Sequence, residues 1–74
     1  MKRLGSCLHT VGSVAVVRSE LDSRPPLDVD VIDSSLDRVG KTVDVFGPVT
    51  KPYVSVTVDE SRDIEPGSKL YIRD

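Results

Sequence analysis

The sequence contains one cysteine, one histidine and no tryptophan, asparagine or glutamine. A single cysteine, Cys7, cannot close an internal disulfide, so we expect a cytoplasmic protein whose fold is held by packing. No run of 18 apolar residues is present, so we expect no membrane-spanning helix. The opening MKRLGSCLHT is not followed by the apolar stretch of a secretory signal peptide.

Side chains that carry out catalysis or bind metals are also scarce. His9 has no nucleophile or orienting carboxylate in a recognisable motif. One cysteine and one histidine cannot make a structural zinc site, and Asp28, Asp30 and Asp33 do not match a calcium-binding loop. We therefore expect no catalytic residue, cofactor, metal or small-molecule substrate.

The sequence also lacks an excess of positive charge. Ten Lys and Arg face twelve Asp and Glu, which gives a net charge of -2 at pH 7 and a pI near 5.2. Proteins that bind nucleic acid on their own usually carry a basic stripe. The charge balance therefore disfavours direct RNA or DNA binding.

Valine dominates what is present. Thirteen of the 74 residues are Val and only one is Ala, a bias typical of strands because β-branched side chains fit a pleated surface. We expect one all-β domain over residues 1–74, with six antiparallel strands in a barrel or sandwich. A barrel is favoured at this size, because closure removes exposed strand edges. The strands are expected at residues 4–8, 13–18, 29–32, 38–46, 53–58 and 69–72.

Alternation along the two clearest strands predicts which side chains point outward. In 38–46 the inward face is expected to hold Val39, Lys41, Val43 and Val45, and the outward face Gly40, Thr42, Asp44 and Phe46. In 53–58 the expected inward residues are Val54, Val56 and Val58. Tyr53, and Tyr71 in the last strand, are then also outward.

Aromatic side chains on the outside of so small a barrel favour a surface that another molecule covers. Pro48 and Pro52 stiffen the connection between Phe46 and Tyr53, so docking there costs little entropy. A single β-bulge would reverse the alternation and place Phe46 inside as a core plug. Both interpretations remain open at this point.

The residues of this region resemble a known family. The string from Val39 to Val49, followed by Pro52, Tyr53 and Val54, is similar to the signature of the GAR-type subunit of box H/ACA ribonucleoproteins. MKRLG at the start, Leu8-His9 and Val31-Ile32-Asp33 are similar to archaeal members. The resemblance extends over nearly the whole chain.

The resemblance implies a six-stranded split barrel of the elongation-factor type and a non-catalytic subunit. Such a subunit docks on the catalytic subunit of the pseudouridine synthase and promotes rRNA pseudouridylation and substrate turnover in ribosome biogenesis. Guide and substrate RNA are then affected only indirectly, and residues 1–74 contain nothing like the glycine/arginine-rich tails of eukaryotic family members. Carried onto this sequence, the docking residues are Val45, Phe46, Gly47, Pro48, Val49, Pro52 and Tyr53.

The alternative is an RNA-binding small barrel of the ribosome-maturation type. That function needs aromatic residues interleaved with Lys or Arg, so that bases stack beside neutralised phosphates. Only Lys51, near Tyr53, and the face formed by Lys69, Tyr71 and Arg73 offer this arrangement.

Overall fold

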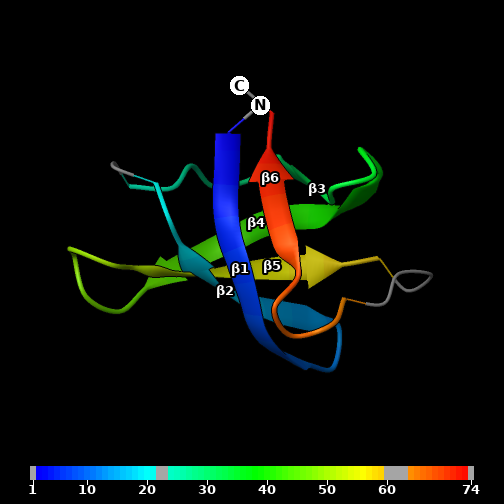
Figure 1. Cartoon of the computed structure of the whole chain (residues 1–74). Helices are drawn as coiled ribbons and strands as arrows, with labels where there is room; N and C mark the ends of the chain where they lie inside the picture. The colour runs from blue at the N-terminus through cyan, green and yellow to red at the C-terminus, as the bar shows by residue number, and fades with distance from the viewer. Residues whose placement is uncertain (1, 22–23, 60–63, 74) are drawn as a thin grey trace.

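The computed structural model describes residues 2–21, 24–59 and 64–73, and these form six strands joined by turns and loops. Figure 1 shows the strands wrapped around a common interior. The strands are β1 (Lys2–Val11), β2 (Val14–Ser19), β3 (Asp30–Ile32), β4 (Arg38–Phe46), β5 (Tyr53–Val58) and β6 (Lys69–Ile72).

The strands pair in the order β1-β2-β5-β4-β3-β6, and β6 pairs back onto β1 to close the barrel. Every pairing is antiparallel. The expected all-β, six-stranded antiparallel barrel is therefore confirmed. Because the barrel closes, each of the six described strands has two hydrogen-bonded neighbours, so none of them is an edge strand.

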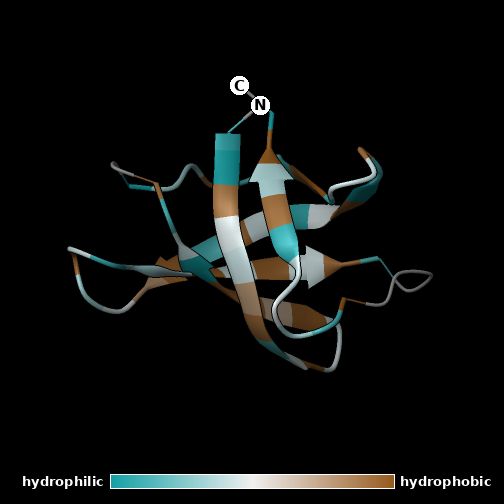
Figure 2. Cartoon of the chain, in the orientation of Figure 1, coloured by the Kyte–Doolittle hydropathy of each residue, from teal (hydrophilic) through white to brown (hydrophobic). Residues whose placement is uncertain are grey.

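The interior is filled mainly by branched aliphatic side chains from all six strands, with a cysteine, an alanine and one residue from the loop before β6. Figure 2 shows apolar segments alternating with polar ones along the strands that enclose this core. Burying these side chains supplies the main stabilisation of so small a fold. The cluster comprises Leu4, Cys7, Ala15, Val17, Val31, Val39, Val54, Val56, Ile64, Leu70 and Ile72.

The first hairpin extends further than expected. β1 runs to Val11 instead of ending at Leu8, and the turn consists of Gly12 and Ser13 alone. The register between β1 and β2 shifts between Cys7 and His9. A bulge of this kind adds one residue and bends the strand, and pairing continues beyond it from His9 to Val11.

The predicted faces of β4 are wrong in the middle of the strand. Thr42 was expected outside but is fully buried, whereas Val43 was expected inside and is 43% exposed. The register with β5 shifts between Thr42 and Asp44, so a bulge at Val43 resets the alternation. Gly40 is likewise buried and Lys41 exposed, contrary to prediction, because the register with β3 already shifts between Arg38 and Gly40.

After the bulge, the structure agrees with the prediction again. Val45 pairs with the buried Val54, and Phe46 pairs with Tyr53 on the outer side. Phe46 is 43% exposed, so it does not plug the core. A bulge could have turned Phe46 inward, but the bulge at Val43 lies three residues before Phe46 and this ring remains outside.

The buried Thr42 fixes the segment that leads into β3. Its hydroxyl donates to the carbonyl of Pro26 at 2.9 Å and accepts from the amide of Val29 at 3.2 Å. The backbone of Thr42 also bonds to Asp28 and Val29. This strand residue therefore holds the described part of the expected loop 19–28 against the barrel. Of the expected loop 59–68, residues 60–63 lie outside the described residues.

Candidate functional site

The two aromatic residues at the end of the β4–β5 hairpin form a contacting pair. Phe46 and Tyr53 are direct cross-strand partners, their ring centroids lie 5.6 Å apart, and their planes are inclined by 32°. This separation is typical of favourable aromatic contacts. Tyr53 is half-buried and supports Phe46, whose ring keeps an exposed face.

Gly47 permits this packing. Its φ is +89°, and a Cβ at this position would lie 2.7 Å from Cδ2 of Tyr53. A larger residue would meet the tyrosine ring and adopt an unfavourable backbone conformation. The glycine of the motif therefore positions the ring of Tyr53 against the start of the loop.

The loop at residues 47–52 is anchored at one end and apolar at its tip. Pro52 is buried, and its carbonyl accepts a hydrogen bond of 3.0 Å from the amide of Ser19 in β2. Val49 is 97% exposed, and Pro48 is exposed beside it. An apolar tip on a fixed loop is suited to contact with another molecule, since little conformational freedom remains to be lost.

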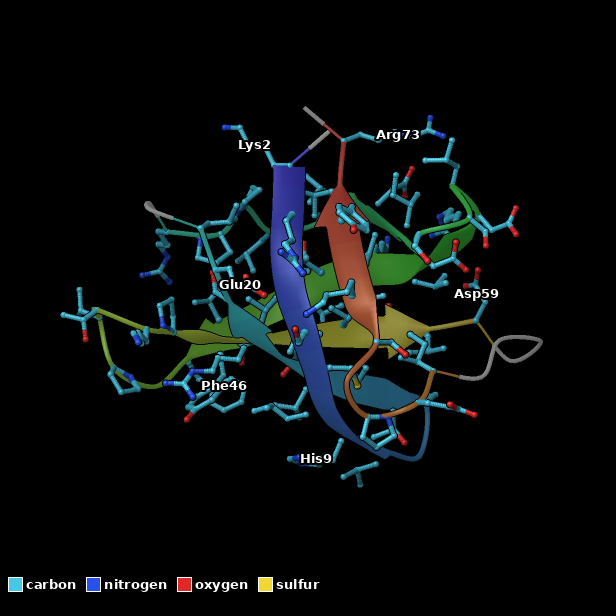
Figure 3. All side chains as sticks on the ribbon, in the orientation of Figure 1. Lys2, His9, Glu20, Phe46, Asp59 and Arg73 are labelled. Atoms are coloured by element: carbon cyan, nitrogen blue, oxygen red, sulfur yellow. The ribbon has the colours of Figure 1, made fainter. Side chains whose placement is uncertain are left out.

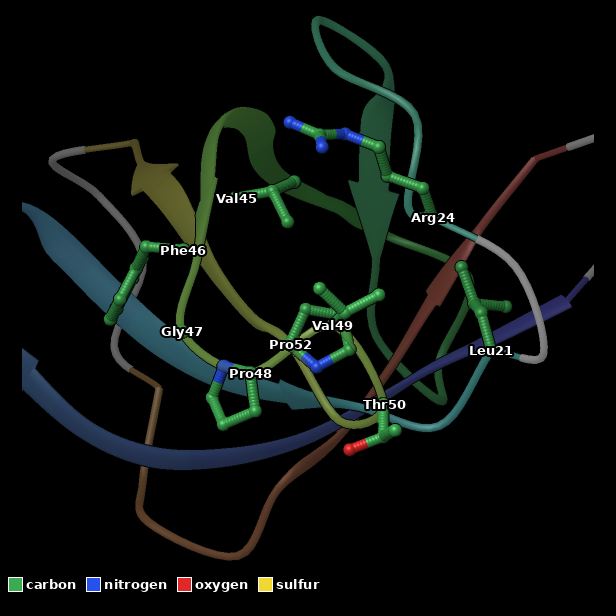
Figure 4. A pocket seen from close by; sticks show the side chains of 9 residues that line it. All are labelled: Leu21, Arg24, Val45, Phe46, Gly47, Pro48, Val49, Thr50 and Pro52. Atoms are coloured by element: carbon green, nitrogen blue, oxygen red, sulfur yellow. The ribbon is translucent and has the colours of Figure 1, made fainter.

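A depression of about 300 Å³ lies alongside this loop. In Figure 4, the loop side chains stand between Phe46 on one side and Leu21 and Arg24 on the other. Tyr53 does not line it but holds Phe46 in place. Six of the seven predicted docking residues line the depression, namely Val45, Phe46, Gly47, Pro48, Val49 and Pro52.

Leu21, Arg24 and Thr50 also line the depression and were not predicted. The signal that could have identified Leu21 is a lone apolar residue in the otherwise polar segment before Pro25-Pro26. Its position beside the β4–β5 loop depends on the strand order, in which β2 and β5 are neighbours.

The other candidate groups do not converge on a site. His9 is exposed on β1, while Cys7 is buried, and burial raises the pKa of its thiol above the ordinary value. Arg38 bridges Asp30 and Asp59 at 3.0 and 2.8 Å. Among the described residues there is no group of three or more His, Cys, Asp or Glu side chains that could hold a metal ion.

Comparison with known proteins gives a consistent result. A family model described as the Gar1/Naf1 RNA binding region matches residues 1–74. An uncharacterized protein of Methanothermobacter thermautotrophicus is 33% identical over 79 residues, covering 97% of this chain and 83% of that protein. An uncharacterized protein of Methanocaldococcus jannaschii is 44% identical over 36 residues, which are 49% of this chain and 43% of that protein.

In the part of the chain that the structure describes, no helix is long and apolar enough to cross a membrane.

Proposed function

This chain belongs to the Gar1/Naf1 family, and on that premise we propose that it docks on the catalytic subunit of the pseudouridine synthase in the box H/ACA particle. The family is one of non-catalytic accessory proteins with an H/ACA-associated or RNA-binding role. The finer proposal is that docking promotes rRNA pseudouridylation and substrate turnover during ribosome biogenesis. Guide and substrate RNA are then affected indirectly.

The apolar tip of the loop at residues 47–52 is the observation that carries this proposal. Val49 is almost completely exposed, and the neighbouring ring of Phe46 keeps 43% of its surface exposed. An exposed aromatic ring held on a fixed scaffold is typical of the anchors of protein interfaces, and the exposed valine adds apolar area beside it. The proposed contact residues are Val45, Phe46, Gly47, Pro48, Val49, Pro52 and Tyr53.

A direct RNA contact is the second candidate function, because the matched family model is described by RNA binding. Lys69, Tyr71 and Arg73 lie close together on β6 and just after it, with Lys69 and Arg73 exposed and Tyr71 half-buried. A filter-binding assay on the isolated chain tests this function. Tight binding of RNA that weakens steeply with salt would support it.

We also propose a cytoplasmic location. Cys7 is a free, buried thiol, and thiols remain reduced in the cytosol. Fractionation of the native cells, with immunodetection of this chain, tests the location. Recovery with secreted or membrane material would contradict it.

The docking proposal is tested with Phe46→Asp and with Tyr71→Asp as the matched control. Both variants introduce a carboxylate at an aromatic position on the outside of the barrel. We expect Phe46→Asp to stay folded by circular dichroism and to lose co-migration with the synthase subunit of the same organism, whereas Tyr71→Asp keeps it. Folded Phe46→Asp that binds with wild-type affinity would rule out docking through this surface.

A further inference from the structure

A second depression, of about 270 Å³, adjoins the proposed docking surface and has a different chemistry. It lies where the middle of β1 and the end of β2 approach the β4–β5 loop. Two cations, Arg18 and Lys51, line it together with one apolar side chain, Leu8. The remaining lining residues are Ser6, Ser19 and Glu20.

Main-chain pairing brings the two cations together from distant parts of the sequence. Arg18 is the cross-strand partner of Tyr53, so it follows Phe46 and Tyr53 in a row across the sheet. The amide of Ser19 bonds to the carbonyl of Pro52 at 3.0 Å, which places the neighbouring Lys51 beside the end of β2. The depression is therefore continuous with the aromatic pair and the apolar loop.

These cations also differ from the paired cations of the barrel. Arg3 pairs with Glu20, Arg38 with Asp30 and Asp59, and Lys41 with Asp28. Arg18 and Lys51 are exposed, and neither forms an ion pair or side-chain hydrogen bond with a described residue. Two positive charges that have no ion-pair partner among the described residues thus lie beside an exposed apolar surface.

We propose that this depression receives an aspartate or glutamate side chain of the partner protein that covers Phe46 and Val49. The inference rests on the proposed function, because it assigns a charge to the partner surface next to the apolar contact. Arg18 and Lys51 supply positive charge from two sides, and Leu8 contacts the methylene part of the entering side chain. Complementary charges at the rim of an apolar contact steer association and fix the orientation of the partner.

The distribution of charge favours an acidic protein segment over an RNA strand. Glu20 lines the same depression and is 3.8 Å from Arg3. Asp44 is exposed two residues before Phe46, and its carboxylate accepts from the amide of Val45. A phosphate chain crossing this surface would meet both carboxylates. A protein surface can instead place its own cations opposite them.

The test is the double variant Arg18→Glu, Lys51→Glu, with Lys2→Glu, Arg73→Glu as the control of equal net charge. Figure 3 shows Lys2 and Arg73 at the end of the barrel that carries the termini, apart from Phe46. Association with the synthase subunit is measured by surface plasmon resonance at roughly 0.05 M and roughly 1 M salt, where the Debye length falls from about 14 Å to about 3 Å.

At low salt we expect the double variant to associate roughly tenfold more slowly than wild type, because reversed rim charges act mainly on the association rate. At high salt the two rates should converge, and the control should match wild type throughout. The milder pair Arg18→Gln, Lys51→Gln should show an intermediate loss, which separates charge from any disturbance of the fold.

The inference would be overturned if the Glu and Gln double variants at Arg18 and Lys51 both associated at the wild-type rate at low salt. A loss of synthase binding in Phe46→Asp would still support the docking surface in that case. A loss with Arg18→Glu, Lys51→Glu that persists unchanged at high salt would also overturn it. Two further probes distinguish other occupants. If the wild-type chain binds a single-stranded oligouridine in a salt-sensitive way and only Arg18→Glu, Lys51→Glu loses this binding, the depression receives RNA. If the wild-type chain self-associates in the ultracentrifuge and only that double variant does not, the depression receives a second copy of the chain. Either result would overturn the inference.

Discussion

Replacing Val49 with Asp probes the docking surface without disturbing the barrel. The side chain of Val49 is 97% exposed, so almost none of its burial energy contributes to folding. Surface substitutions away from special features usually change stability by no more than about 0.5 kcal/mol. The effect of Val49→Asp on binding can therefore be read directly, unlike that of Phe46→Asp, whose ring is partly covered by the barrel.

The size of the expected effect follows from the exposure of Val49. Completely burying a valine side chain is worth about 1.5–3 kcal/mol, and nearly all of this amount is still available to a partner at this position. Since about 1.4 kcal/mol corresponds to a tenfold change in affinity, losing the contact should weaken binding by about tenfold to 150-fold. Burying the new carboxylate without a partner would weaken it further.

The assay is isothermal titration calorimetry of the synthase subunit with wild type, Val49→Asp and Val11→Asp. Val11 is also an exposed valine, but it lies at the β1–β2 hairpin. We expect weaker binding for Val49→Asp only, with urea unfolding unchanged for that variant. An affinity within twofold of wild type would refute the argument that the loop tip lies in the interface.

Two further predictions concern stability and are measured by urea unfolding. A Cβ on Gly40 would lie 1.5 Å from the carbonyl oxygen of Thr57, so Gly40→Ala should destabilise the barrel by about 3 kcal/mol or more. Gly12→Ala should cost only about 1 kcal/mol, because its Cβ would have no atom within 4 Å and only the φ of +59° is unfavourable. Similar unfolding midpoints for the two variants would contradict this prediction. Leu36 is exposed and has a φ of +69°. Because Asn tolerates this backbone conformation better than Leu, Leu36→Asn should stabilise the barrel by about 0.5–1 kcal/mol. A lower unfolding midpoint for this variant would contradict the prediction, since it would show that the leucine side chain stabilises the fold by more than its backbone strain costs.

The strands could be predicted because they depend on local alternation, whereas the direction of Phe46 was left open because a single bulge would reverse it. Val54 and Val56 face inward as their spacing requires, and Phe46 lies outside. The bulge at Val43 could not be predicted, because it arises from the register between β4 and β5. An earlier register shift against β3, between Arg38 and Gly40, reverses the predicted faces of Gly40, Lys41 and Thr42, and the bulge at Val43 restores the predicted alternation.

The candidate site could be predicted only where its residues are consecutive in the sequence. Residues 45–49, 52 and 53 were predicted as docking residues from the motif and the two prolines, and the structure brings all of them except Tyr53 to one depression. Leu21 and the cation pair Arg18 and Lys51 were missed as parts of the surface, since they join it through the pairing of β2 with β5 and the Ser19–Pro52 hydrogen bond. Contacts of this kind follow from barrel closure and not from any local pattern.

Closure of the barrel by β1 and β6 also offers a practical route to new forms of the protein. Lys2 is the cross-strand partner of Ile72, so a short glycine-rich linker could join the two ends, and new ends could be opened at the Gly12–Ser13 turn. Such a circular permutant would keep every strand pairing. It would also allow a fluorophore to be attached at the new ends in the β1–β2 hairpin. The fluorophore could then report on binding while the loop at residues 47–52 stays free to contact a partner.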